Sequence, residues 1–330
     1  MLVSSRTPLR VSFFGGGTDY PEYFRRFPGA VVGMAIDRYV YVSALRLSDI
    51  IDYRYRLSYS QLERVSSSSD IEHPVVRAVL AHYEVREALD ISIQADLPAS
   101  SGLGSSSAFT VGLVNLVSAL QKRSVTRLDL AQAAIHVEQV LLSENVGVQD
   151  QLHASFGGLN RFDFVDGRTR ITPIQMTGPC LDRLLSSLVL IYTGKTRFAS
   201  KVLTEQVQAT KEQKIDAELS HLLKLVDQSV DVLEGDDPEM MLREFGAMVH
   251  EGWQTKRKLS SGVSNPDIDA LYEKALAAGA TGGKLCGAGG GGFLLMVVPP
   301  ENRRNFDDSL SGHNLIPIKM DRHGSVILTS

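Results

Sequence analysis

The chain has 330 residues, of which 43% are hydrophobic and 22% charged, a composition typical of a globular enzyme that excludes a disordered chain. Its formal net charge is −4 and its Lys and Arg residues are spread along the sequence, which excludes a broad basic surface for nucleic acid. Its apolar runs are shorter than the roughly 18 to 20 residues of a membrane helix, and its first residues lack the apolar core of a signal peptide. Its two cysteines, Cys180 and Cys286, are too few for a disulfide framework. We therefore expect a cytoplasmic protein with free thiols, and neither nucleic acid nor a membrane as a partner.

The first half of the chain mixes strands with a few helices. Runs of β-branched and aromatic residues predict strands over 11–14, 31–36, 39–45 and 91–95. Apolar patterning predicts a helix over 74–83 and a helix buried all round over 108–120. A capping box at Thr126–Asp129 predicts a third helix that runs to about residue 143.

The second half is richer in helix. Helical periodicity predicts helices near 200–234, 238–258 and 267–278, with strands over 188–192, 293–298 and 315–320. The change near residue 185 from a sequence rich in predicted strands to one rich in predicted helices predicts two domains, 1–184 and 185–330. The order of elements indicates the α+β class and not a regular βαβ alternation.

A loop rich in serine and glycine joins the strand that ends at Ala95 to the buried helix. Its glycines let backbone amides approach a ligand closely, and the unpaired amides and dipole at the start of the helix favour an anion there. The alternative, a Ser-rich linker or a plain helix cap, fits poorly with a loop that runs directly into a buried helix. We therefore predict a phosphate-binding loop formed by Pro98, Ser100, Ser101, Gly102, Leu103, Gly104, Ser105, Ser106 and Ser107.

Two further glycine clusters lie near the ends of the chain. Gly15–Gly17 follows the first strand and presents Thr18 and Asp19, which suit substrate hydroxyls, although Asp19 equally suits a cap of the next turn. The cluster 287–292 matches Gly-x-Gly-x-x-Gly, but a strand follows it, so a dinucleotide-binding fold is excluded. We expect this cluster to connect two strands tightly, either as a purely structural turn or as a loop open to a ligand. The candidate substrate ligands are Gly16, Gly17, Thr18, Asp19, Gly287, Ala288, Gly289 and Gly290.

Two carboxylates are candidates for the chemistry. Asp150 lies in a short, weakly polar segment where a carboxylate can take a proton from a hydroxyl. Glu138 leans on the apolar stripe of its helix, where an unpaired carboxylate is costly. Either a buried salt bridge or a magnesium ion shared with a serine of the loop would offset that cost.

These motifs, together and in this order, resemble those of the GHMP kinases (galactokinase, homoserine kinase, mevalonate kinase and phosphomevalonate kinase). The resemblance covers most of the chain and rests on segments 6–24, 98–108 and 284–293. It implies an N-terminal ribosomal-protein-S5-like α/β domain, a C-terminal ferredoxin-like domain, and ATP in the cleft between them. It also implies that the serine loop wraps the ATP phosphates and that Ser106 and Glu138 hold Mg²⁺. Asp150 would be the catalytic aspartate, with Arg10 beside the reacting hydroxyl.

The N-terminal motif narrows the substrate. Galactokinases carry Gly-Glu-His-Thr-Asp-Tyr where this chain has Gly-Gly-Gly-Thr-Asp-Tyr at 15–20, so the Glu-His pair is absent. Segments 6–24 and 249–259 are similar to those of bacterial D-glycero-D-manno-heptose 7-phosphate kinases, which implies phosphorylation of an anomeric hydroxyl. A phosphorylated sugar would need a positive clamp, with Lys195 and Arg197 as first candidates, followed by Arg25, Arg26, Lys256 and Lys258. A fucokinase-like enzyme, a mevalonate-type kinase and a non-catalytic sugar-binding regulator remain alternatives, and the sequence leaves open a homodimer.

Overall fold

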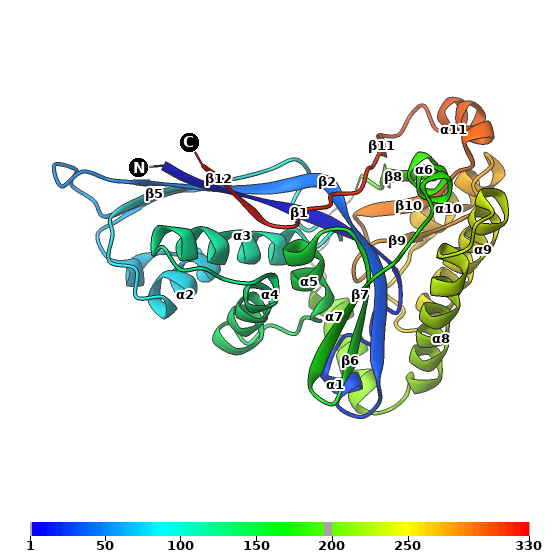
Figure 1. Cartoon of the computed structure of the whole chain (residues 1–330), viewed down its shortest axis with the longest axis horizontal. Coiled ribbons are helices and arrows are strands. Elements are labelled where there is room, and N and C mark those ends of the chain that lie inside the picture. Colours follow the sequence, from blue (N-terminus) through cyan, green and yellow to red (C-terminus); the bar gives the residue numbers. More distant parts are fainter. Residues whose placement is uncertain (1, 195–199, 330) are drawn as a thin grey trace.

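The computed structural model describes residues 2–194 and 200–329. Its larger sheet has eight strands in the order β12-β1-β2-β5-β3-β4, with β6 paired to β2 and β7 paired to β6. These strands are β1 (Leu2–Phe14), β2 (Gly29–Arg46), β3 (Tyr55–Ser58), β4 (Leu62–Val65), β5 (Leu89–Ala95), β6 (Leu159–Val165), β7 (Arg168–Pro173) and β12 (Val326–Thr329). Figure 1 shows β1 and β2 running the length of this sheet and bending together toward α1 (Pro21–Phe24).

The bend follows from a change of partner along β2. Residues 29–34 of β2 pair with β6, whereas residues 40–46 pair with β5, and β1 follows β2 along both halves. The two strands predicted over 31–36 and 39–45 are therefore one long strand. Register shifts at Pro8/Leu9 and Ser12/Phe14 interrupt the β1–β2 ladder on the way. Such irregularities bend a strand and redirect its side chains, and here they fall next to the residues that form the site.

One face of this sheet is covered by α3 (Ser105–Leu120), with α2 (Pro74–His82), α4 (Arg127–His136) and α5 (Gln149–Phe156) beyond it (Figure 1). Most residues of α3 are buried, as its all-round apolar sequence predicts, because it lies between the sheet and the other helices. The capping box at Thr126 is confirmed, but the helix that it begins passes at Val137–Leu141 into a π-helical turn. A short 3-10 turn (Ser68–Asp70) precedes α2.

The smaller sheet has four antiparallel strands in the order β11-β8-β10-β9. They are β8 (Leu188–Tyr192), β9 (Gly282–Leu285), β10 (Phe293–Val297) and β11 (Leu315–Pro317). The helices of this half are α6 (Gly178–Ser187), α7 (Ser200–Lys211), α8 (Asp216–Leu233), α9 (Pro238–Lys256), α10 (Pro266–Ala277) and α11 (Arg303–Ser309), with a 3-10 turn at Pro300–Asn302. The strand order and the helical crossovers are those of a ferredoxin-like unit, so the predicted fold class is confirmed.

The two sheets meet where β1 ends. Phe13 and Phe14 pack edge-to-face on Phe245 of α9, with ring centroids 5.1 and 5.6 Å apart, and a single hydrophobic core continues through this contact. From the other end of the chain, β12 returns to pair with β1. The division between residues 184 and 185 stays a prediction.

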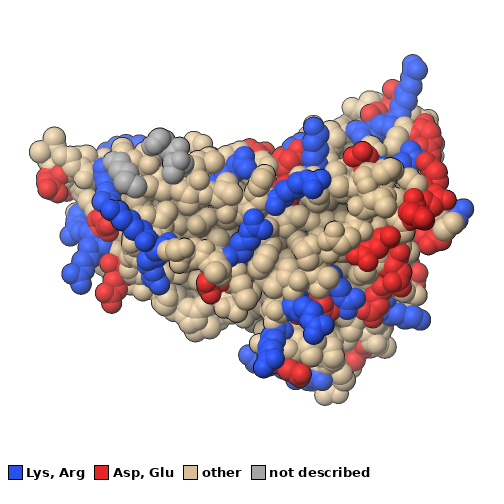
Figure 2. Space-filling model, viewed as in Figure 1, with Lys and Arg blue, Asp and Glu red and all other residues tan. Residues whose placement is uncertain are grey.

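Charge is distributed unevenly over the surface. On the face shown in Figure 2, Asp and Glu side chains gather over the end of the molecule that holds α8 to α11, while Lys and Arg are scattered. Cys180 and Cys286 are both free and buried, as expected. Within the described residues, no helix combines the length and the apolar character that a membrane span requires.

Candidate active site

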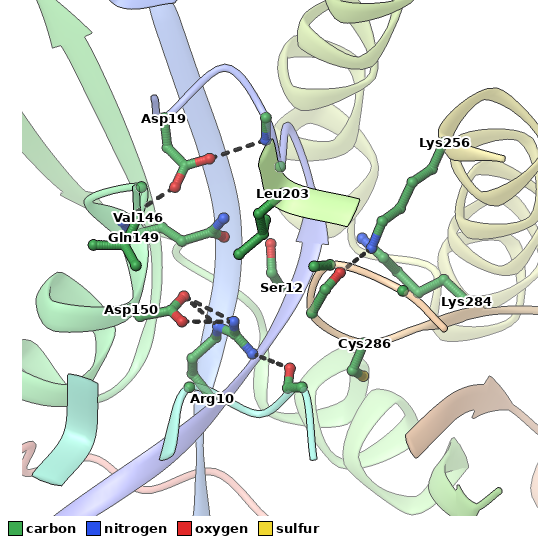
Figure 3. Close-up of a pocket in the computed structure, with 18 of the residues that line it drawn as sticks. Arg10, Ser12, Asp19, Val146, Gln149, Asp150, Leu203, Lys256, Lys284 and Cys286 are labelled. Carbon is green, nitrogen blue, oxygen red and sulfur yellow. Dashed lines mark hydrogen bonds and ion pairs between the residues drawn. The ribbon is translucent and has the colours of Figure 1, made fainter. Parts of the chain in front are cut away.

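A cavity of about 280 Å³ lies where loops from both halves of the chain converge (Figure 3). Its walls come from β1 and the turn after it, the serine loop, the start of α5, the end of α9 and the glycine loop between β9 and β10. The cavity brings together many of the predicted site residues, namely Arg10, Gly16, Gly17, Asp19, Ser100, Gly102, Gly104, Ser105, Ser106, Ser107, Asp150, Gly287, Ala288 and Gly289.

Arg10 and Asp150 form a two-pronged ion pair on one wall of this cavity. The Nε and Nη2 atoms of Arg10 donate to the two carboxylate oxygens of Asp150 at 2.8 and 2.9 Å, and Nη1 donates to the carbonyl of Gly102 at 2.7 Å. Arg10 is 5% exposed; burial opposes its charge, but the Asp150 carboxylate outweighs this effect and raises the pKa of the guanidinium. Asp150 stays partly open to the cavity, with a quarter of its side chain exposed. It lies in the first turn of α5, a helix that the sequence did not predict.

Asp19 is fully buried and organises the turn after β1. Its carboxylate accepts hydrogen bonds from the amides of Gly17 (2.9 Å) and Gln149 (3.3 Å), so it joins this turn to the start of α5. Burial raises the pKa of the Asp19 carboxyl, and the hydrogen bond from Gly17 offsets part of this effect. Thr18 does not line the cavity: its hydroxyl donates to the carbonyls of Gly15 and Ala30, both at 2.8 Å. Thr18 therefore stabilises the turn after β1 instead of binding a ligand in the cavity.

The serine loop ends at Gly104, whose φ of +75° makes it a left-handed cap without a side-chain hydrogen bond. The amides of the first helical turn, at Ser105, Ser106 and Ser107, have no partner within α3, and all three residues line the cavity. An anion in the cavity therefore meets free amides and the positive end of a long buried helix. The cavity wall does not include Pro98, Ser101 or Leu103. The Leu103 carbonyl accepts a hydrogen bond from the backbone amide of Arg10 at 3.0 Å and so joins the loop to β1.

Glu138 lies behind this helix start, in the π-helical turn, and is 1% exposed. Its Oε2 accepts hydrogen bonds from the Ser107 hydroxyl (2.9 Å) and from the side-chain amide of Gln151, whereas Oε1 has no hydrogen-bond partner in the described residues. Burial raises the pKa of Glu138 to about 7. No ion pair involving Glu138 is present among the described residues, so the alternative of a buried salt bridge is not supported.

This arrangement fits a divalent cation. The unpartnered Oε1 of Glu138 and the neighbouring Ser107 hydroxyl are hard oxygen ligands of the kind that Mg²⁺ takes when phosphate oxygens complete its shell. The described residues contain no group of three His, Cys, Asp or Glu side chains that would hold a metal unaided. The ligands on offer therefore suit a metal that arrives with a nucleotide better than a permanent metal centre.

The glycine loop between β9 and β10 packs against the serine loop, backbone to backbone, and the predicted tight connection of two strands is confirmed. A Cβ on Gly102 would lie 2.4 Å from the carbonyl oxygen of Cys286, and one on Gly287 would lie 2.5 Å from the Cα of Gly102. This contact closes the cavity between the two halves of the chain. Gly290 takes part in the loop without lining the cavity.

Replacing Gly102 by Ala should open this contact. The φ of +81° disfavours any Cβ, and the clash with the Cys286 carbonyl adds to that cost, so we expect the free energy of unfolding to fall by at least about 2 kcal/mol. Urea unfolding measures this loss. Gly167→Ala is the matched control, because Gly167 has a φ of +69° but nothing within 4 Å of its Cβ position. If both variants lose equal stability, the loop contact contributes nothing.

Several cavity residues were not predicted as site residues. Ser12 and Gln149 each present a buried oxygen without a hydrogen-bond partner in the described residues, a signal that needs the folded structure to be seen. Lys284, quoted only as part of the glycine motif, lines the wall with Lys256 and Cys286 (Figure 3). The remaining newly found lining residues are Phe13, Phe14, Gly15, Tyr20, Val146, Gly147, Leu203, Gln206, Leu222, Gly252, Leu259 and Gly291.

The basic residues predicted to bind a substrate phosphate differ in where the structure places them. Lys195 and Arg197 lie outside the described residues. Arg26 is bound elsewhere, with both Nη atoms 2.8 Å from the carboxylate of Asp216. Arg25 and Lys258 are exposed and absent from the described cavity wall, which leaves Lys256.

Comparison with known proteins agrees with this geometry. The family model described as GHMP kinases N terminal domain matches residues 70–158, and that of GHMP kinases C terminal matches residues 239–310. A D-glycero-alpha-D-manno-heptose 7-phosphate kinase of Campylobacter jejuni is 27% identical over 301 residues, covering 87% of this chain and 86% of that protein. An L-fucokinase/L-fucose-1-P guanylyltransferase of Bacteroides fragilis is 26% identical over 87% of this chain, which spans 34% of that longer protein.

Solved structures show the same fold. A D-glycero-D-manno-heptose 1-phosphate kinase of Bacteroides thetaiotaomicron superposes with a TM-score of 0.74 at 24% identity, over 99% of both chains. The family models match segments that include the serine loop, Glu138, Asp150 and the glycine loop between β9 and β10. The chain belongs to the GHMP kinase family of ATP-dependent phosphotransferases.

Proposed function

We propose that this chain is an ATP-dependent sugar 1-kinase that phosphorylates the anomeric hydroxyl of D-glycero-D-manno-heptose 7-phosphate and yields the 1,7-bisphosphate. The C. jejuni relative, which is similar over most of both chains, supports the choice of substrate. One observation carries the reaction type: the Arg10–Asp150 pair and the free amides of α3 line the same cavity.

The residues divide the work of phosphoryl transfer. The amides of Ser105, Ser106 and Ser107 bind the transferred phosphates, while Asp150 accepts the hydrogen bond, and finally the proton, of the attacking hydroxyl. Arg10 fixes both oxygens of Asp150 and so holds that carboxylate at the cavity wall. Ser106 and Glu138 would hold Mg²⁺, which when bound neutralises phosphate charge.

The acceptor lies in our proposal between Asp150 and the turn after β1. Ser12 and Gln149 supply the unpartnered oxygens that sugar hydroxyls would satisfy. Asp19 shapes this end of the cavity through its bonds to Gly17 and Gln149.

ADP release with Mg-ATP tests this proposal on four acceptors: heptose 7-phosphate, unphosphorylated heptose, L-fucose and galactose. We expect turnover on heptose 7-phosphate at least about 100-fold more efficient than on the others, since a buried charged site rejects an acceptor that lacks its partner. A preference for fucose would favour the second candidate, a fucokinase, which the B. fragilis relative supports. Absence of ADP release with every acceptor would contradict the sugar-kinase proposal and favour a non-sugar acceptor first, and a non-catalytic regulator after that.

A further inference from the structure

Two lysines share one wall of the cavity without a carboxylate partner. Lys284, on β9, is 8% exposed and donates to the carbonyl of Phe13 at 2.8 Å. Lys256, the last residue of α9, donates to the carbonyls of Leu285 (3.1 Å) and Gly287. In the described part of the chain, no acidic side chain lies within ion-pair distance of either ammonium group. One buried and one partly buried cation are therefore held by neutral carbonyl groups alone.

Such an arrangement is costly while it is empty of anions. Burial, and then the charge of Lys256, lower the pKa of Lys284 to about 7. Burial lowers the pKa of Lys256 to about 8, with Arg10 adding to the decrease and Cys286 and Asp19 opposing it. A bound anion would offset the burial and the mutual repulsion together, which is the usual reason to keep two unpaired cations in a cavity.

The position of the pair assigns it to the acceptor and not to the nucleotide. Figure 3 shows both lysines across the cavity from Arg10 and Asp150, with Ser12 between the two groups. Three residues of β1 follow the cavity wall from one group to the other. Arg10 binds Asp150, Ser12 has an unpartnered hydroxyl, and the carbonyl of Phe13 accepts the hydrogen bond from Lys284. At about 3.3 Å per residue, the backbone from Arg10 to Phe13 spans about 10 Å at most, the scale of one sugar with a terminal phosphate.

We propose that Lys256 and Lys284 bind a phosphate group carried by the acceptor sugar, at the end remote from the hydroxyl that Asp150 receives. This inference rests on the proposed function and supplies its specificity: the two lysines select phosphorylated over free sugars. The free amides at the start of α3 form a separate anion position for the nucleotide.

Lys284→Met and Lys256→Met test the assignment, because Met keeps the length and apolar stem of Lys and removes the charge. We expect each variant to lower kcat/KM for heptose 7-phosphate about 30- to 100-fold, mainly through KM. The KM for ATP and kcat/KM for the unphosphorylated heptose should stay within about threefold of wild type. Lys258→Met is the matched control, since Lys258 is exposed two residues further along and does not line the cavity. A rise in the KM for ATP instead would show that the lysines bind a phosphate of the nucleotide, and it would overturn the inference.

A binding measurement separates failure of this inference from failure of the proposed function. Inorganic phosphate should raise the Tm of the wild-type chain and of Lys258→Met, and raise it much less in Lys284→Met and Lys256→Met. This stabilisation should weaken between pH 7 and 9, as the lysines lose their protons. If wild type phosphorylates no sugar but shows this pattern, the anion site stands and the proposed reaction fails. If wild type phosphorylates heptose 7-phosphate and both Met variants match it, the reaction stands and the lysine site fails.

Discussion

Asp150→Asn should lower kcat by about 10²- to 10⁴-fold with the acceptor that the wild type uses. The amide cannot take the proton of the attacking hydroxyl, and its NH₂ group faces the donors of Arg10, so one of the two hydrogen bonds at 2.8 and 2.9 Å is lost. The KM for ATP should change little, because the amides of α3 that bind phosphate are unaltered. Steady-state ADP release with saturating Mg-ATP measures both parameters.

The matched control is Asp163→Asn. Asp163 also forms an ion pair with an arginine, since Nε and Nη2 of Arg161 lie 2.7 to 2.8 Å from its Oδ1, but this pair is on β6 and absent from the cavity wall. It should keep wild-type kcat. Equal activity of Asp150→Asn and wild type would show that Asp150 neither accepts the proton nor orients the hydroxyl, and the reaction that we derive from the cavity would be wrong.

Glu138→Gln should raise the Mg²⁺ concentration needed for half-maximal activity by about 100-fold, because the unpartnered Oε1 loses its charge as a ligand. Activity titrated with Mg²⁺ at fixed ATP gives this value. Glu144→Gln is the control, as Glu144 lies close enough to act on the charge of Glu138 but is exposed and absent from the cavity wall. An unchanged Mg²⁺ requirement in Glu138→Gln would exclude Glu138 as a metal ligand.

The same substitution has a pH-dependent effect on the free chain. The pKa of Glu138 rises from an ordinary 4.5 to about 7 on folding, so below pH 4.5 the carboxyl is protonated in both states. As the pH rises toward 7, the unfolded chain loses this proton first, and wild type loses stability relative to Glu138→Gln. Above pH 7 the difference levels off at about 3 kcal/mol at most, from 1.36 kcal/mol per pKa unit. Urea unfolding of both proteins at pH 5 and pH 8, without Mg²⁺ or ATP, measures it; a difference independent of pH would contradict the burial effect.

The local parts of the site were predictable from the sequence. The serine loop, the buried helix after it and the strand connection at Gly287 each depend on residues that are close in the chain, and the structure has all three. Capping at Thr126 was predictable for the same reason. Turns, helix caps and apolar patterns depend on residues within about a dozen positions of one another. They can therefore be predicted without knowledge of the fold.

The long-range parts of the site were not predictable. Lys256 and Lys284 come from the end of α9 and from β9, which are distant in the sequence and pack together only in the folded chain. The unpartnered oxygen of Ser12 lies beside an irregularity in the β1–β2 register. Arg26 appeared equivalent to Lys256 in the sequence, yet the fold pairs it with Asp216. Whether a charge is neutralised or free is set by tertiary contacts, which residue type and spacing do not encode.

The most direct test of the central claim is the ³¹P NMR spectrum of a reaction of wild-type chain with Mg-ATP and heptose 7-phosphate. We expect one new phosphomonoester signal, coupled to the anomeric proton, to grow in step with ADP while the 7-phosphate signal persists. A new phosphate on a different hydroxyl, or ADP formed without a new phosphomonoester, would contradict an anomeric sugar kinase.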